Sequence, residues 1–253
     1  MKHRTGFLPE PSDSKHKAFE THLLPFLHRH ISERTLVVDM RLFSLTRRDQ
    51  GNTYSCVGHA VVKAIEIREA VKNGVHNVVP LSVLSDYYLA RELMFPKQIE
   101  MDKGTFVAHA CEAAHRFGVC PETDWPFDAA KVNVSPDWVA MREAYNHRLN
   151  GFFKITATGQ DRVRKVKDAL AHSYPVVIGT DVGDNWDNYH ANQVLGVCPN
   201  PTDKHATVLL GDLNGIFIGE NSWGSDWGEQ GFYKMDPAVI ASDQTYECWI
   251  VEI

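Results

Sequence analysis

Residues 49–56 read Asp49-Gln50-Gly51-Asn52-Thr53-Tyr54-Ser55-Cys56, and together with a second stretch near the C-terminus they are the most informative part of the sequence. The second begins at His205-Ala206 and reaches Asn221-Ser222-Trp223-Gly224. A thiol attacks as thiolate, and a helix N-terminus or a neighbouring imidazolium favours that form. The two stretches therefore predict one site that contains Cys56 and His205.

The residues after Ser55 predict a buried helix with Cys56 in its first turn. Apolar side chains recur at helical spacing from Val57 to Val71, and Asn73-Gly74 ends the run. Ser55 is a suitable N-cap. The unpaired N–H groups and the dipole of a helix N-terminus stabilise an anion there by ~0.3–1 kcal/mol. Further helices are expected over residues 82–93, capped by Ser82, over 105–117, capped by Thr105, and over 136–147 and 161–171.

The C-terminal half changes to a pattern of short strands, expected over residues 152–156, 175–180, 206–213, 216–220 and 231–235. Asn214-Gly215 separates two of them and favours a type I′ hairpin turn. Such a hairpin brings the His205 end of one strand beside the Asn221 end of the next. The separation of sixteen residues between His205 and Asn221 fits two strands and a tight turn.

These residues together resemble the papain-like cysteine peptidases, from about residue 38 to the C-terminus. The shared features are the spacing from Gln50 to Cys56, the His205-Ala206 strand start and the Asn221-Ser222-Trp223-Gly224 motif. The resemblance implies an α+β, papain-like two-lobed fold with an active-site cleft between the lobes. A mainly helical lobe, residues 36–130, would carry the nucleophile, and a mainly β, barrel-like lobe, residues 131–253, would carry His205 and Asn221.

The chemistry expected of the site is hydrolysis of peptide bonds through a thioester. Cys56 and His205 would form a thiolate–imidazolium pair, and the side chain of Gln50 with the Cys56 backbone N–H would stabilise the oxyanion. The amide oxygen of Asn221 would orient the imidazole while Trp223 shields that hydrogen bond from water. The resemblance also implies that substrate lies extended across the cleft, with one side chain in a pocket near Ala206.

Three residues beside Cys56 depart from the family pattern, and one of them is Val57, which follows Cys56 where the family has an aromatic residue. Thr53 removes the partner for a disulfide next to the site. Tyr54 places a phenol where the family usually has glycine, so it is expected to contact substrate and to narrow the cleft.

Residues 1–35 form a polar extension, without the long helical pro-segment typical of secreted zymogens of this family. An amphipathic stretch at its centre contains Phe19, Leu23, Leu24, Phe26 and Leu27. Two arrangements remain open: an extension packed on the body of the protein, or a short plug of the cleft.

Composition excludes several other functions. The net charge of −6, with no block of Lys or Arg, gives no electrostatic footprint for nucleic acid or anionic lipid. No apolar run is long enough for a signal peptide or a membrane span, so residence in the cytoplasm is expected. Five cysteines, an odd number, do not indicate a disulfide framework. The polypeptide substrate is the only partner expected, and the oligomeric state is left open.

Alternatives to these assignments start from other residues. His190-Ala191 is a rival for His205-Ala206, because it too is followed by an apolar run. Cys111, His115 and Cys120 are a weak zinc candidate, since they lack the known ligand spacings, and we expect no metal and no cofactor. A catalytically silent binding module of the same fold, or a Cys-dependent acyltransferase or deamidase, would use the same residues.

Overall fold

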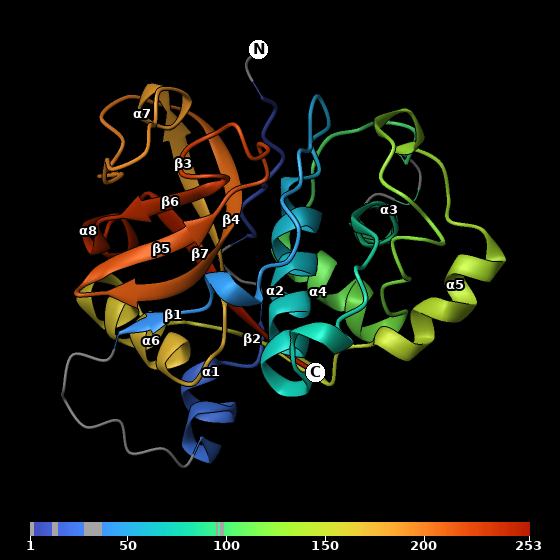
Figure 1. Ribbon diagram of the computed structural model, residues 1–253, viewed down its shortest axis with the longest axis horizontal. Helices are drawn as coiled ribbons and strands as arrows, with labels where there is room; N and C mark the ends of the chain where they lie inside the picture. The colour runs from blue at the N-terminus through green and yellow to red at the C-terminus, as the bar shows by residue number, and fades with distance from the viewer. Residues whose placement is uncertain (1–2, 12–14, 28–36, 95, 97–98) are drawn as a thin grey trace.

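The computed structural model describes residues 3–11, 15–27, 37–94, 96 and 99–253. A helical part and a β-sheet lie side by side, with the helix α2 between them (Figure 1). Part of the extension, including the His28–His30 stretch, lies outside the described residues.

The helical part is built on three helices: α2 Cys56–Asn73, α3 Val83–Met94 and α4 Val107–Arg116. Nearly all of α2 is buried because it packs on α3 and α4 on one side and on the sheet on the other. The shorter α5, Trp138–Ala144, lies at the outer side of this part (Figure 1). The helices expected from the periodicity are therefore present, with ends shifted by a few residues.

Only one of the three expected N-caps is confirmed. The Ser82 hydroxyl accepts a hydrogen bond from the backbone N–H of Ser85 at 3.2 Å. Ser55 makes no capping bond, because its hydroxyl bonds Thr53 and His59 instead. The N-cap of α4 is Phe106 rather than Thr105. A side-chain partner elsewhere can thus displace a cap that local sequence favours.

The strands form one antiparallel sheet in the order β2-β7-β3-β4-β5-β6, with β1 paired to β4. All five strands expected from the sequence are present with somewhat different ends, and β1 and β7 were not expected. The strands are β1 Val38–Asp39, β2 Gly151–Lys154, β3 Val176–Gly183, β4 Pro201–Leu213, β5 Ile216–Glu220, β6 Phe232–Met235 and β7 Thr245–Glu252.

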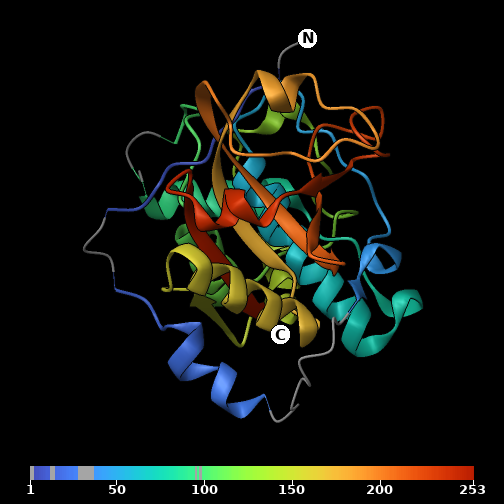
Figure 2. The ribbon, with the colours of Figure 1, turned by 90° about the vertical axis from the view of Figure 1, so that its left-hand side faces the viewer.

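Helices cover the outer face of the sheet. The helix α6, Gly159–Ala171, lies across it and packs against α8, Pro237–Ala241 (Figure 2). The other short helices are α1 Phe19–His22, α7 Asp184–Asp187, and the 3₁₀ turns Leu24–Phe26, Arg41–Phe43, Val75–Asn77, Ala129–Lys131 and Tyr145–His147.

The hairpin between β4 and β5 has the expected turn. Asn214 and Gly215 both have positive φ, 55° and 90°, as a type I′ turn requires. The two strands pair from Leu213 opposite Ile216 to Val208 opposite Glu220. His205 on β4 and Asn221 directly after β5 consequently lie at the same end of the hairpin.

The second half of the extension packs on the sheet side. Phe19 is fully buried, and the backbone of Ala18 pairs with Lys154 on β2. The Glu20 carboxylate accepts hydrogen bonds from the backbone N–H groups of Thr156 and Ala157. This half of the extension is thus packed on the body of the protein, which is one of the two expected arrangements.

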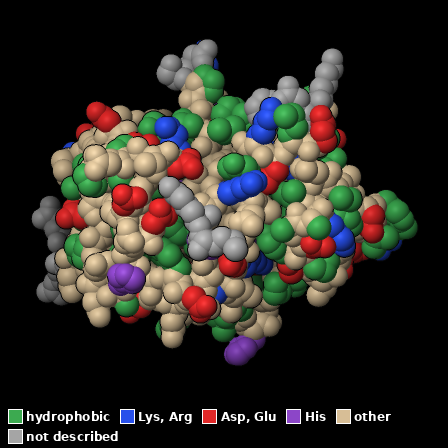
Figure 3. All heavy atoms as spheres, turned by 90° about the horizontal axis from the view of Figure 1, so that it is seen from above, with side chains coloured by type: hydrophobic (Ala, Val, Ile, Leu, Met, Phe, Trp, Pro, Cys, Tyr) green, Lys and Arg blue, Asp and Glu red, His purple; other side chains and the backbone are tan. Residues whose placement is uncertain are grey.

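The surface shows acidic and basic side chains interspersed on the face seen from above (Figure 3). Within the described part of the chain, none of the helices has the length and apolar character needed to cross a membrane.

Candidate active site

Cys56 is the first residue of α2 and is fully buried. Its Sγ accepts a hydrogen bond from the backbone N–H of Gly6 at 3.1 Å. Burial raises the pKa of the Cys56 thiol to about 12, against the opposing effect of the backbone N–H groups of Ala206, Gly6 and Val57. Burial of Cys56 in this conformation therefore opposes the thiolate expected from the sequence.

His205 and Asn221 are joined as the sequence predicts. The imidazole Nε2 lies 2.8 Å from the Asn221 Oδ1, which also accepts the backbone N–H of Ser222 at 2.7 Å. Because that oxygen is an acceptor, Nε2 carries the proton and Nδ1 holds a lone pair. Burial lowers the pKa of His205 to about 4, although the bond to Asn221 raises it.

No hydrogen bond joins the thiol to the imidazole in the described part of the chain, since His205 Nδ1 has no partner there. The backbone N–H of the next residue, Ala206, nevertheless donates to the Cys56 sulfur and lowers the pKa of the thiol. The two side chains therefore lie in one region of the molecule, and burial disfavours the charged form of each. The expected ion pair stays a prediction.

Aromatic rings enclose the His205–Asn221 pair. Trp223 lies against the imidazole with 4.9 Å between ring centroids, and Trp186 meets it edge-on at 6.0 Å. Trp223 is 4% exposed, as expected for a residue that keeps water from the hydrogen bond. His3 stacks on Trp223 at 5.2 Å.

Gln50 is fully buried, and its amide has a fixed orientation. Its Oε1 accepts the Ser222 hydroxyl at 2.6 Å, while its Nε2 donates to the carbonyl of Thr53 at 2.9 Å and to that of Arg4 at 2.8 Å. The side chain expected to donate to an oxyanion thus donates to a peptide carbonyl of the chain's own N-terminus.

Residues 3–8, here called the N-terminal segment, run between the sheet and the helical part (Figure 1). The backbone of Phe7 pairs in parallel with Thr105, which donates to the Gly6 carbonyl at 3.0 Å and accepts from the Leu8 N–H at 3.1 Å. The Arg4 guanidinium lies over the Tyr54 ring at 5.0 Å. This half of the extension therefore has the plug arrangement.

Gly6 permits the close approach of this segment to the nucleophile. A Cβ at Gly6 would lie 1.8 Å from the Tyr54 carbonyl oxygen, a distance that no side chain tolerates. Because the obstacle is backbone, the segment cannot keep its place with any larger residue at position 6.

The Phe7 ring lies against the sheet near Ala206, where the sequence predicts a pocket for a substrate side chain. Phe7 is 2% exposed, and its ring lies against Gly179, the register partner of Ala206 on β3. A Cβ on Gly179 would be 2.2 Å from the ring's Cζ. Tyr246 approaches the same ring, with 6.1 Å between centroids. The absence of a side chain at Gly179 therefore provides the room for an aromatic ring.

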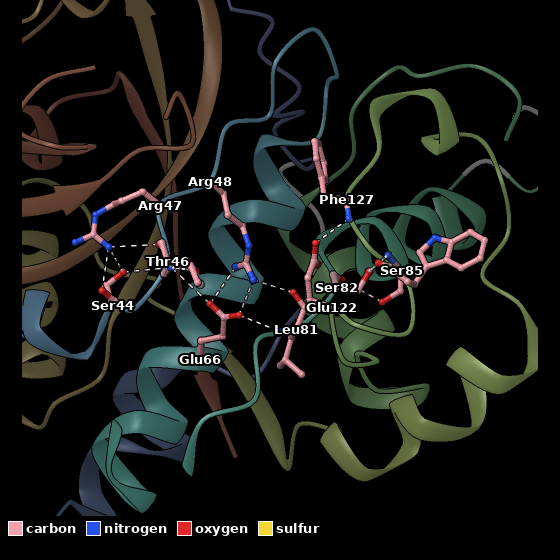
Figure 4. Close-up of polar contacts among 12 residues, drawn as sticks. Ser44, Thr46, Arg47, Arg48, Glu66, Leu81, Ser82, Ser85, Glu122 and Phe127 are labelled. Atoms are coloured by element: carbon pink, nitrogen blue, oxygen red, sulfur yellow. Dashed lines mark hydrogen bonds and ion pairs between the residues drawn. The ribbon is translucent and has the colours of Figure 1, made fainter. Parts of the chain in front are cut away.

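A buried ion pair fixes the loop that carries Gln50 (Figure 4). Arg48 donates to both carboxylate oxygens of Glu66 on α2, at 3.0 and 2.7 Å, and to the Leu81 carbonyl at 3.0 Å. The same carboxylate accepts the Leu81 N–H at 2.8 Å. Although burial raises it, the pKa of Glu66 is lowered overall by Arg48 and Lys63, so the carboxylate stays charged.

The residues that the sequence offered as alternatives, among them His190, Cys111 and His115, have surroundings that differ from those of Cys56 and His205. His190 is exposed, and its backbone pairs with Gly228. Cys111 is buried in α4, whereas His115 bonds the Leu149 carbonyl at 2.7 Å. All five cysteines are free.

Sequence reasoning missed several residues of this region: Gly6, Phe7, Asp102 and Gly179. None carries a motif, since each acts through its backbone or through a contact made far away in the sequence. The glycines at 6 and 104 are the only sequence signal that two backbones approach closely there.

Comparison with known proteins places the chain in a family. Residues 37–250 match the model of the papain family of cysteine proteases. The chain therefore belongs to the papain family of cysteine proteases.

Among individual relatives, an uncharacterized peptidase C1-like protein of Acanthamoeba polyphaga mimivirus is 28% identical over 83% of this chain and 70% of its own length. A viral cathepsin of Choristoneura fumiferana defective polyhedrosis virus is 26% identical over 77% of this chain, which spans about half (56%) of that protein. Of solved structures, xylellain, a cysteine protease from Xylella fastidiosa, superposes with a TM-score of 0.79 at 23% identity, covering 98% of this chain and 95% of its own. That likeness shows the shared fold.

Proposed function

We propose that the chain is a thiol-dependent peptidase in which Cys56 is the nucleophile and His205 the acid–base residue. The observation that carries this proposal is the His205–Asn221 hydrogen bond beside a cysteine in the first turn of a buried helix. Spacing alone predicts these partners, and the fold supports the assignment.

The first half of the reaction forms a thioester. The Cys56 thiol gives its proton to His205 Nδ1, and the thiolate attacks the carbonyl carbon of the substrate's peptide bond. The Gln50 Nε2 and the Cys56 backbone N–H donate to the resulting oxyanion, an interaction worth ~2.7–4 kcal/mol of barrier for one donor. His205 then protonates the departing amine as the C–N bond breaks.

The second half returns the enzyme to its starting state. His205 takes a proton from water, the hydroxide attacks the thioester carbonyl, and the C–S bond breaks to release the acid. The His205 proton returns to the sulfur. Asn221 holds the imidazole plane through both halves, and an uncharged partner suffices because the thiolate already balances the imidazolium.

The N-terminal segment supports a latent form of this enzyme. It covers Cys56, occupies the Gln50 donor with the Arg4 carbonyl and fills the pocket beside Ala206 with Phe7. Since substrate needs the same places, segment and substrate compete. In our proposal, displacement of the N-terminal segment admits water to Cys56 and His205. These two side chains can then form the thiolate–imidazolium pair.

The substrate that fits this proposal is an extended polypeptide with an aromatic side chain for the Phe7 pocket. The same thioester would pass to an amine in an acyltransferase, whereas Tyr54 and Val57, which depart from the family pattern beside Cys56, favour a silent binding module. Five free cysteines are consistent with a reducing compartment, so we retain the cytoplasm as the proposed location.

The test uses the full chain with Gly6→Ala, which the Tyr54 carbonyl forces out of the cleft, and the same chain with Cys56→Ala added. We expect the first to cleave denatured casein and to be labelled at Cys56 by E-64, an inhibitor found in complex with a cysteine protease of Carica candamarcensis. The second should do neither. Labelling without cleavage would favour the binding module, and incorporation of an added amine would favour acyl transfer.

A further inference from the structure

Asp102 connects the nucleophile loop with a second element of the cleft. Its Oδ2 accepts the backbone N–H of Tyr54 at 3.0 Å, and its Oδ1 accepts the Tyr87 hydroxyl at 2.5 Å. Tyr54 lies two residues before Cys56. One oxygen of the carboxylate thus holds the loop that leads into α2, and the other is bonded to a side chain of α3.

The connection continues to the backbone that pairs with the N-terminal segment. The Tyr87 hydroxyl accepts the N–H of Gly104 at 3.0 Å, and Thr105 follows directly. Gly104 has a φ of 81°, and a Cβ there would lie 2.1 Å from the Gly6 carbonyl oxygen. Residues 104 and 105 are therefore an edge against which an extended chain lies closely.

The directions of these hydrogen bonds agree with one another. Tyr87 is fully buried, and burial together with Asp102 raises its pKa well above the ordinary value, so the hydroxyl keeps its proton. It donates that proton to Asp102 and accepts from Gly104 through a lone pair. The Arg91 guanidinium lies over the ring at 4.5 Å and holds it in place.

We infer that Asp102 is a positioning residue that keeps the backbone at residues 104–105 at a fixed place relative to Cys56, so that an extended peptide can pair with Thr105 while its carbonyl meets the sulfur. The inference rests on the proposed function, in which substrate takes the place of residues 6–8. Because Thr53 offers no sulfur for a crosslink beside the site, the hydrogen bonds of Asp102 with Tyr54 and Tyr87 make this connection without a covalent bond.

The first test needs no catalytic activity. Amide hydrogen exchange is measured in the full chain at Thr105, whose N–H bonds the Gly6 carbonyl, and at Leu8, whose N–H bonds the Thr105 carbonyl. We expect Asp102→Ala to speed exchange at both by about tenfold or more, because each lost hydrogen bond is worth about that factor. Exchange rates in Asp102→Asn, which keeps one acceptor oxygen, should lie between those of the wild type and of Asp102→Ala. Wild-type exchange rates in Asp102→Ala would overturn the inference.

A matched control is Asp137→Ala, which removes an aspartate that also accepts two backbone N–H bonds, from Val139 and Ala140, but at the start of α5. It should leave exchange at Thr105 and Leu8 unchanged. Should Asp102→Ala fail to fold, Tyr87→Phe serves instead, because it keeps the buried ring and removes only the hydroxyl. We expect the same faster exchange, and unchanged exchange in this variant would also overturn the inference.

The second test separates positioning from a general structural role. In the Gly6→Ala chain, Asp102→Ala or Tyr87→Phe should lower kcat/KM for an extended peptide by about tenfold, mainly through KM, while iodoacetamide alkylates Cys56 at the unchanged rate. An equal fall in kcat/KM and in the alkylation rate of Cys56, or no fall in either, would contradict the inference. If the Gly6→Ala chain cleaves no peptide while the exchange result holds, the proposed function fails and the positioning of residues 104–105 stands.

Discussion

Cys56 is subject to two opposing effects in this structure. The first turn of α2 favours a thiolate by ~0.3–1 kcal/mol, whereas burial raises the thiol pKa to about 12. Burial therefore has the larger effect and disfavours the thiolate under the N-terminal segment. In our proposal, the exposed and ionised thiol expected from the sequence belongs to the form in which this segment is displaced.

Gly179 offers a prediction at the same scale. In the Gly6→Ala chain, Gly179→Ala should lower kcat/KM for peptides with a phenylalanine in the Phe7 pocket by about tenfold or more, because a Cβ overlaps the ring. Peptides with alanine there should be cleaved at the unchanged rate. The measurement is kcat/KM for the two peptides in both chains. An equal effect of Gly179→Ala on both peptides would show that Gly179 does not determine which side chain the pocket accepts.

Two pairs of catalytic candidates could be predicted from the sequence because the spacing within each pair is local. Gln50 and Cys56 belong to one loop and helix start, and the Asn214-Gly215 hairpin brings His205 to Asn221. Asp102 and Gly179 could not be predicted, since their partners lie tens of residues away and only the folded chain brings them together.

Among the elements, helices and strands with clear periodicity were predicted well, and their ends and caps less so. Ser55 did not cap α2, because its hydroxyl bonds the neighbouring side chains of Thr53 and His59 instead. The strand β7 was missed because its residues are buried almost throughout, so no alternation of polar and apolar side chains marks it.

The junction between α2 and the Gln50 loop allows a stability prediction. Glu66→Gln leaves the guanidinium of Arg48 buried without its carboxylate, and leaves Lys63 with Glu220 as its carboxylate partner, so the free energy of unfolding should fall by about 3–5 kcal/mol. Urea unfolding measures this free energy. Glu112→Gln on α4, whose exposed carboxylate faces Arg116, is the control and should change it by less than about 1 kcal/mol. Equal losses in the two variants would show that the ion pair does not brace the loop.

At the scale of the whole molecule, the sequence predicted two packed parts with the site between them but left the extension undecided. The structure has both arrangements in one extension: residues 15–27 pack on the sheet side, and residues 3–8 lie in the cleft. A short polar segment gives no periodicity from which to read its place. Its position depends on Gly6 meeting the Tyr54 carbonyl, a contact visible only in three dimensions.

The most direct test of the account is the rate at which iodoacetamide alkylates Cys56 as a function of pH, mapped by mass spectrometry in the wild-type and Gly6→Ala chains. A thiol with a raised pKa is almost entirely protonated at neutral pH, so wild-type alkylation should be slow there and rise only in strong base. Gly6→Ala should react about a hundredfold faster or more near pH 7, because water and the imidazolium then lower the pKa. Equal rates in the two chains across the pH range would contradict the claim that the N-terminal segment keeps the nucleophile neutral.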